Sequence, residues 1–193
     1  ASVLKHREGM GYICAVAASF AGLFAFVTAS PFLYLDYFGL SPGTYPLVFG
    51  VNVVVIALSN RINIHLLRKR MPQQNLRLGL LIQLVAALGL VAVTALDIAS
   101  LVIVVPLIML FTGMIGLITP NAISSLLDHF GHISATATAL LGGIQFTCGA
   151  LAGVMVGLFE VEHLWPMVLT MLGAALLGNI GVRKLTKAPA ADE

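Results

Sequence analysis

The sequence predicts an all-α, polytopic membrane protein built from six transmembrane helices. Of its 193 residues, 59% are hydrophobic and only 9% are charged, whereas soluble domains carry about 25% charged residues. Six apolar runs approach the length of about 20 residues that crosses a bilayer. None of them alternates as a barrel strand does, and an open segment in lipid satisfies its own backbone only as a helix.

The six spans are expected to form a single transmembrane domain over residues 1–193. Their approximate bounds are 11–35, 45–67, 76–96, 99–125, 134–159 and 165–182, and a tail follows at 183–193. The connections are short and rich in turn residues, as in Gly39-Leu40-Ser41-Pro42-Gly43 and Met71-Pro72-Gln73-Gln74. This arrangement leaves no run of sequence for a soluble domain.

Basic residues gather on one side of this topology. All ten Lys and Arg residues fall there: Lys5, Arg7, Arg61, Arg68, Lys69, Arg70, Arg77, Arg183, Lys184 and Lys187. The opposite connections hold Asp36, Asp97, Glu160 and Glu162 without Lys or Arg. Since cytoplasmic loops are enriched in Lys and Arg, we expect a cytoplasmic-membrane protein with both termini in the cytoplasm. The basic triplet at 68–70 then acts as a stop signal or contacts anionic head groups, and no nucleic acid partner is needed to explain the charge.

Several chemistries are not expected. The sequence shows no phosphate loop, nucleophile elbow or metal-binding cysteine pair, which argues against an enzyme and against a bound cofactor. Cys14 and Cys148 fall inside predicted helices and are interpreted as small core residues. Asp128, His129 and His132 could supply metal ligands, but such residues more often end a helix, and no metal site is expected.

The first three and last three predicted helices cross the membrane in opposite senses, as inverted repeats do. Ser30-Pro31 lies in the last third of the first helix, and Thr119-Pro120 lies in the last third of the fourth. Proline frees a carbonyl group, and the preceding hydroxyl can satisfy it. Each pair is therefore expected to form either a hinge or a fixed kink.

Polar residues divide the helices into two groups. The third and sixth have few of them and are expected to be peripheral, whereas the other four combine amides and hydroxyls with Phe. A cavity walled by such residues would suit bulky, partly apolar solutes, although the same side chains could simply fill the core and bond neighbouring helices. The fifth helix also carries a small-residue series expected to pack against another helix, namely Gly149, Gly153 and Gly157.

Three stretches resemble the last six helices of Bcr/CflA-type multidrug efflux transporters of the major facilitator superfamily. They are AGLFAFVTASPFLYL at 21–35, Asn60-Arg61 with Arg77-x-Gly79-x-x-Ile82-Gln83, and PNAISSLLDHFGHISATATALLGGIQF at 120–146. The resemblance covers nearly the whole chain. It implies one half of a transporter that exports drugs such as bicyclomycin, or other small toxic compounds, in exchange for protons.

The expected mechanism is alternating access, in which this bundle rocks against an N-terminal six-helix half. The residues expected to form the substrate-binding wall are Phe26, Thr28, Tyr34, Asn52, Thr112 and Gln145. Those expected to form the cytoplasmic gate are Asn60, Arg61 and Asp128. Superfamily members often have a Gly-x-x-x-Asp-Arg-x-Gly loop at this gate. Here Asn60-Arg61 stands at the Asp-Arg positions, and Asn63 replaces the second glycine.

No Asp or Glu lies near the middle of a predicted span. The proton-coupling residues are therefore expected in the missing half, and the chain, which begins at Ala1 without a signal pattern, is expected to be a piece of a longer polypeptide. The alternative is a membrane scaffold that does not transport, or a half-transporter that must oligomerise. In a scaffold, substitutions on the polar helix faces would affect assembly alone.

Overall fold

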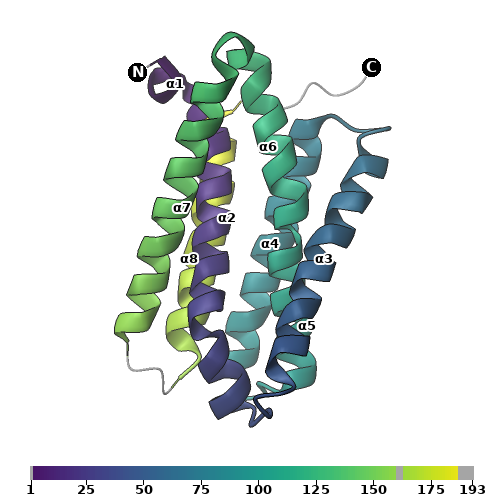
Figure 1. Ribbon diagram of the computed structural model, residues 1–193, viewed down its shortest axis with the longest axis vertical. Helices are drawn as coiled ribbons and strands as arrows, with labels where there is room; N and C mark the ends of the chain where they lie inside the picture. The colour runs from purple at the N-terminus through teal and green to yellow at the C-terminus, as the bar shows by residue number, and fades with distance from the viewer. Residues whose placement is uncertain (1, 160–162, 187–193) are drawn as a thin grey trace.

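The computed structural model describes residues 2–159 and 163–186 and is helical throughout, with no strand in these two ranges. The long helices are α2 (Arg7–Pro31), α3 (Tyr45–Leu66), α4 (Pro72–Ala95), α5 (Leu101–Gly113), α6 (Ile115–Phe130), α7 (Ser134–Leu158) and α8 (Trp165–Leu185). Shorter elements are α1 (Ser2–Lys5), the π-helix η1 (Phe32–Tyr37) and the 3₁₀-helix η2 (Gly131–Ile133). The all-α prediction is confirmed (Figure 1).

Five continuous helical stretches are long and apolar enough to cross a membrane: Arg7–Tyr37, Tyr45–Leu66, Pro72–Ala95, Leu101–Leu158 and Trp165–Leu185. The fourth stretch is 58 residues long and doubles back at η2, where α6 and α7 form a hairpin (Figure 1). The described chain therefore passes along the bundle six times, in the order that the apolar runs predict.

The helix ends differ from the predicted bounds in several places. For example, α2 begins at Arg7, before the predicted residue 11, and α6 ends at Phe130, after the predicted residue 125. Met71-Pro72-Gln73-Gln74, expected as a turn, instead starts α4, because Pro72 suits the first helical position and the Gln74 Oε1 atom accepts a hydrogen bond of 3.1 Å from the Met71 backbone N–H. At the other end of the chain α8 continues to Leu185. The expected tail thus begins inside this helix, and residues 187–193 lie outside the described part.

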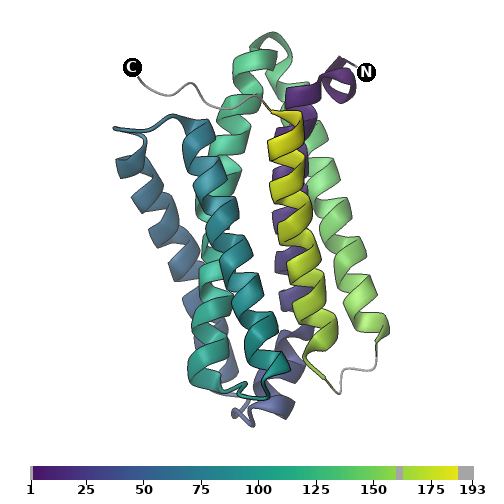
Figure 2. The same ribbon diagram turned by 180° about the vertical axis from the view of Figure 1, so that it is seen from behind.

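The helices pack across the two halves of the chain. α2 packs against α7 and α8, whereas α5 and α6 pack against α3 and α4. The first helix of each triplet is thus surrounded by the second and third helices of the other, as inverted repeats require. α4 and α8, expected to be peripheral, form the rear face of the bundle (Figure 2), and α3 and α7 lie on its two flanks.

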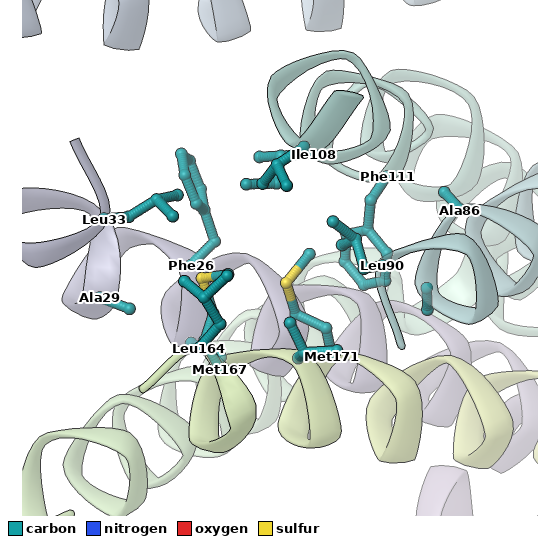
Figure 3. Packing of buried hydrophobic residues seen from close by; sticks show 14 of the residues in the cluster. Phe26, Ala29, Leu33, Ala86, Leu90, Ile108, Phe111, Leu164, Met167 and Met171 are labelled. Atoms are coloured by element: carbon teal, nitrogen blue, oxygen red, sulfur yellow. The ribbon is translucent and has the colours of Figure 1, made fainter. Parts of the chain in front are cut away.

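The core joins both triplets through large apolar side chains. Phe26, Ile108, Phe111 and Met171 come from α2, α5 and α8 and are at most 1% exposed (Figure 3). Gly22 allows this packing, since a Cβ atom there would collide with the Phe111 ring. Because lipid tails are as apolar as these side chains, the contacts stabilise the bundle through close packing more than through the removal of water.

Polar side chains of the rear helices point inward and join helices. The Gln83 Oε1 atom on α4 accepts a hydrogen bond of 2.9 Å from the Ser19 hydroxyl on α2. Asn179 on α8 donates to the carbonyl oxygen of Leu80, also at 2.9 Å. Both amides are therefore hydrogen-bonded inside the bundle, which explains how two peripheral helices can carry them. Cys14 and Cys148, expected as core residues, are free and half-buried.

Candidate functional site

Four of the six expected substrate-binding residues lie together inside the bundle. Phe26, Tyr34, Asn52 and Thr112 are at most 4% exposed. The Phe26 ring meets Tyr34 edge-on at 6.2 Å between centroids, and the Thr112 hydroxyl donates to the Asn52 Oδ1 atom at 3.2 Å. This group, which we call the inner cluster, joins α2, η1, α3 and α5. It is enclosed by this chain's own helices.

The other two expected residues, Thr28 and Gln145, lie outside the inner cluster. Thr28 is exposed on α2, next to the glycines of α7. Gln145 is half-buried on α7, and its Oε1 atom is buried without a hydrogen-bond partner among the described residues. A buried carbonyl oxygen without a donor is unfavourable, so this amide is a candidate to accept a hydrogen bond from a bound molecule.

An aromatic patch lies beside Gln145. The Phe146 ring is 55% exposed and meets Phe20 and Phe24 edge-on, at 5.5 Å and 6.3 Å between centroids. Phe20, Phe24 and Thr28 follow at four-residue intervals and therefore share one face of α2. We call Phe20, Phe24 and Phe146 the aromatic patch. None of these three residues belongs to the six expected to form the substrate-binding wall, although the spacing of Phe20, Phe24 and Thr28 is a signal that could have pointed to them.

The glycine series of α7 faces α2. A Cβ atom at Gly149 would lie 2.9 Å from the Phe24 ring, and one at Gly153 would lie 2.8 Å from the Thr28 hydroxyl. A Cβ atom at Gly157 would lie 3.6 Å from the Thr28 methyl group. The absence of side chains at these positions lets α7 approach α2 closely and sets the position of the aromatic patch.

The two proline pairs lie in different surroundings. Pro31 ends α2 at the junction with the π-helix η1, and the Ser30 hydroxyl contacts both the Val27 carbonyl oxygen at 2.8 Å and the Tyr45 hydroxyl at 2.9 Å. Thr119-Pro120 lies within the continuous helix α6. The actual interruption of this pass is at Met114, between α5 and α6.

The three residues of the expected cytoplasmic gate are not connected to one another by polar contacts. Asn60, Arg61 and Asp128 are all exposed, and the described residues show no hydrogen bond or ion pair between them. A buried amide cluster lies nearby instead, in which the Asn63 Oδ1 atom accepts hydrogen bonds from Asn121 at 2.7 Å and from Asn75 at 3.1 Å. The gate motif indicates only that Asn63 replaces a glycine and gives no sign of this amide cluster.

A contact between His129 and Glu8 joins α6 to α2 at the same end of the bundle. The His129 Nε2 atom on α6 lies 3.1 Å from the Glu8 carboxylate on α2, and the His6 and His129 rings lie 5.1 Å apart between centroids. In the described ranges, no group of three His, Cys, Asp or Glu side chains could hold a metal ion. Glu8, Asp36, Asp97 and Asp128 are the described carboxylates, and all four lie at helix ends.

Many membrane transporters are built from inverted triplets of membrane-spanning helices such as these. Two curated proteins are similar to the chain in sequence. The chain is 29% identical over 182 residues to a bicyclomycin resistance protein homolog of Haemophilus influenzae, covering 94% of this chain and 46% of that protein. It is 29% identical over 188 residues to YdgK of Bacillus subtilis, an uncharacterized MFS-type transporter, covering 96% of this chain and 46% of that protein. These similarities confirm the resemblance to Bcr/CflA-type transporters of the major facilitator superfamily.

The chain spans about half the length of the curated relatives it matches. Neither relative is named as an enzyme. No family model matches the chain, and no solved structure matches it.

Proposed function

We propose that the chain is one half of a proton-coupled exporter of drugs or other small toxic compounds that works by alternating access. The observation that carries the proposal is the aromatic patch, in which the Phe146 ring is 55% exposed. The residue before it on α7, Gln145, has a buried Oε1 atom without a hydrogen-bond partner among the described residues. A second six-helix half, packed on the side of α2 and α7 that carries this patch, would enclose it in a central cavity. The relatives of roughly twice the length support the existence of that half.

Each group of residues has a distinct role in this proposal. A bulky, partly apolar compound would stack on the aromatic patch, while Thr28 and Gln145 supply hydrogen bonds at its edge. The inner cluster of Phe26, Tyr34, Asn52 and Thr112 would hold α2, α3 and α5 in position behind the patch. Bending at Ser30-Pro31 and near Thr119-Pro120 would accompany the rocking of the two halves.

Proton coupling would be the task of the second half. The four described carboxylates, Glu8, Asp36, Asp97 and Asp128, lie at helix ends, away from the depth at which a proton relay would meet the substrate. The protein would lie in the cytoplasmic membrane. The end that carries both termini would face the cytoplasm, because the described Lys and Arg residues belong to the loops and helix turns of that end (Figure 1).

A dye-efflux assay tests the proposal. Cells that express the native polypeptide should accumulate less of a fluorescent, aromatic cation than cells without it, and a protonophore should abolish the difference. The mass of the native polypeptide should be close to twice the 20.3 kDa of this chain. Absence of gradient-dependent efflux from a correctly inserted protein would instead support a membrane scaffold, and a native mass of 20.3 kDa would support a half-transporter that must oligomerise.

A further inference from the structure

Two adjoining hollows open at the end of the bundle that carries the termini. One, of about 400 Å³, lies between α4 and α8 and is bordered by Arg77, Leu78, Leu81, Asn179 and Arg183. The other, of about 560 Å³, lies between the start of α2 and the end of α8. Arg183 borders both. Figure 2 shows the rear helices α4 and α8 running side by side to this end. No residue of the candidate substrate site borders either hollow.

The two hollows are strongly basic. Their described lining contains five cationic side chains, Lys5, Arg7, Arg77, Arg183 and Lys184, and one carboxylate, Glu8. That carboxylate already contacts His129 at 3.1 Å. Five positive charges against one negative charge leave an excess of about four, and cations on several elements at a membrane interface attract anionic groups.

Hydrogen bonds hold two of these guanidinium groups in place. The Arg7 Nη2 atom donates to the backbone oxygen of Lys184 at 2.6 Å, which ties the start of α2 to the last turn of α8. The Arg77 Nη2 atom donates to the Thr186 hydroxyl at 3.1 Å, which ties α4 to the residue that follows α8. These two guanidinium groups are therefore held in the lining of the hollows, where Lys5, Arg183 and Lys184 are exposed. We call the two hollows together the basic recess. Such a recess can hold a phosphate group by several charge-assisted hydrogen bonds.

The recess continues into an apolar surface. Leu78 and Leu81 form one wall of the first hollow, and Leu81 is 45% exposed. Further from this end of the bundle, α4 exposes Val85 and Leu88, and α8 exposes Leu177 and Ile180. A free phosphate ion would contact only the cationic side chains. A phospholipid would contact both the cations and the apolar surface, with its head group in the basic recess and its acyl chain along the leucines.

We propose that the basic recess, which is formed by the two hollows and centred on Arg77 and Arg183, is a binding site for an anionic phospholipid. Binding there would connect α2, α4 and α8, because the recess is bordered by all three. The lipid would stabilise the rear of the bundle without entering the transport pathway.

Lipid titration of the purified native polypeptide tests this proposal. In detergent, phosphatidylglycerol should raise the melting temperature by several degrees and remain bound in native mass spectra, whereas phosphatidylcholine of the same chain length should do neither. Arg183→Gln, at an exposed residue that borders both hollows, should weaken the phosphatidylglycerol effect roughly fivefold. Arg70→Gln, which removes a charge from the α3–α4 loop outside the recess, is the matched control and should behave as wild type.

Two further measurements separate a lipid from a free anion. Inorganic phosphate at the same concentration should raise the melting temperature much less than phosphatidylglycerol does. Leu81→Trp should fill the apolar part and weaken lipid binding without changing the response to inorganic phosphate. An equal response to phosphate and lipid, or an equal loss in Arg183→Gln and Arg70→Gln, would overturn the proposal.

Discussion

The Nδ2 atom of Asn121 lies 2.7 Å from the Oδ1 atom of Asn63, deep between α6 and α3. The same oxygen accepts a second hydrogen bond from Asn75 on α4, at 3.1 Å. A single buried carbonyl oxygen thus joins three helices at the end where the basic residues gather. Interhelical hydrogen bonds of this kind contribute about 0.6–2 kcal/mol in membrane proteins.

Removal of that oxygen should destabilise the bundle. Asn63→Leu leaves the buried amide of Asn75 without its acceptor and takes one acceptor from Asn121, and a buried donor without a partner costs about 1–3 kcal/mol. We expect a clear fall in the thermal unfolding temperature of the purified protein. Asn60→Leu, one turn away and exposed, is the control and should change it little. Equal melting temperatures for wild type and Asn63→Leu would show that the three amides do not stabilise the fold.

The contact between α6 and α3 should not tolerate a side chain at Gly116. A Cβ atom there would collide with the Ile56 carbonyl oxygen and lie 2.9 Å from the Asn60 nitrogen, and both belong to backbone that cannot rotate away. We expect Gly116→Ala to cost about 1–3 kcal/mol, as overpacking does. At Gly142 nothing lies within 4 Å of the same position, so Gly142→Ala should be neutral or slightly stabilising. Thermal unfolding of the two variants compares them directly, and equal losses would contradict the close approach.

The amide of Gln145 should shape the range of exported compounds. Gln145→Ala removes the unpartnered Oε1 atom without creating a clash, so we expect normal insertion and a changed profile. For compounds that donate a hydrogen bond, resistance should fall roughly two- to tenfold, the equivalent of one hydrogen bond. Inhibitory concentrations across a panel of compounds measure this effect.

Thr147→Ala provides the control for Gln145→Ala, because the Thr147 hydroxyl is satisfied by the Gly143 carbonyl oxygen at 2.8 Å and is exposed. Its profile should match that of wild type. An unchanged profile in Gln145→Ala would remove this residue from the substrate-binding wall.

The orientation of the bundle can be measured with single cysteines. In a chain carrying Cys14→Ala and Cys148→Ala, Arg70→Cys should react with a membrane-impermeant maleimide only after the cells are permeabilised. Asp97→Cys, in the connection at the other end, should react in intact cells. The physical reason is the cytoplasmic retention of Lys- and Arg-rich loops. The reverse labelling pattern would place both termini outside.

Hydropathy and charge predict much of this fold. Each apolar run forms a helix because lipid leaves the backbone no other way to satisfy its polar groups. The interruption near the middle of the fourth pass could not be placed in the same way. Thr119-Pro120 suggested a hinge, whereas the helix breaks at Met114, between Gly113 and Gly116, which both lie close to α3. That contact depends on a helix more than 50 residues earlier and leaves no local signal.

The candidate site was harder to predict because composition does not specify which way a helix faces. Phe26 and Tyr34 have the residue types of a substrate wall but point into the bundle, where they are at most 1% exposed. Phe146 occupies an exposed position one residue after Gln145. The amide cluster of Asn63, Asn75 and Asn121 depends on three helices meeting, which the spacing along the chain does not reveal.

The crossed packing of the two triplets affects how the chain folds during synthesis. α2 ends at Pro31, but its main partners α7 and α8 begin at Ser134 and Trp165. At about 5–20 residues per second, the ribosome needs roughly 5–20 s to produce the first residues of α7 after α2 has emerged. During that interval the α2 residues that contact α7 and α8, such as Phe24, Thr28 and Cys14, have only lipid or an insertion factor as neighbours on that side. α2 therefore gains its main packing partners only after α3 to α6 have been synthesised.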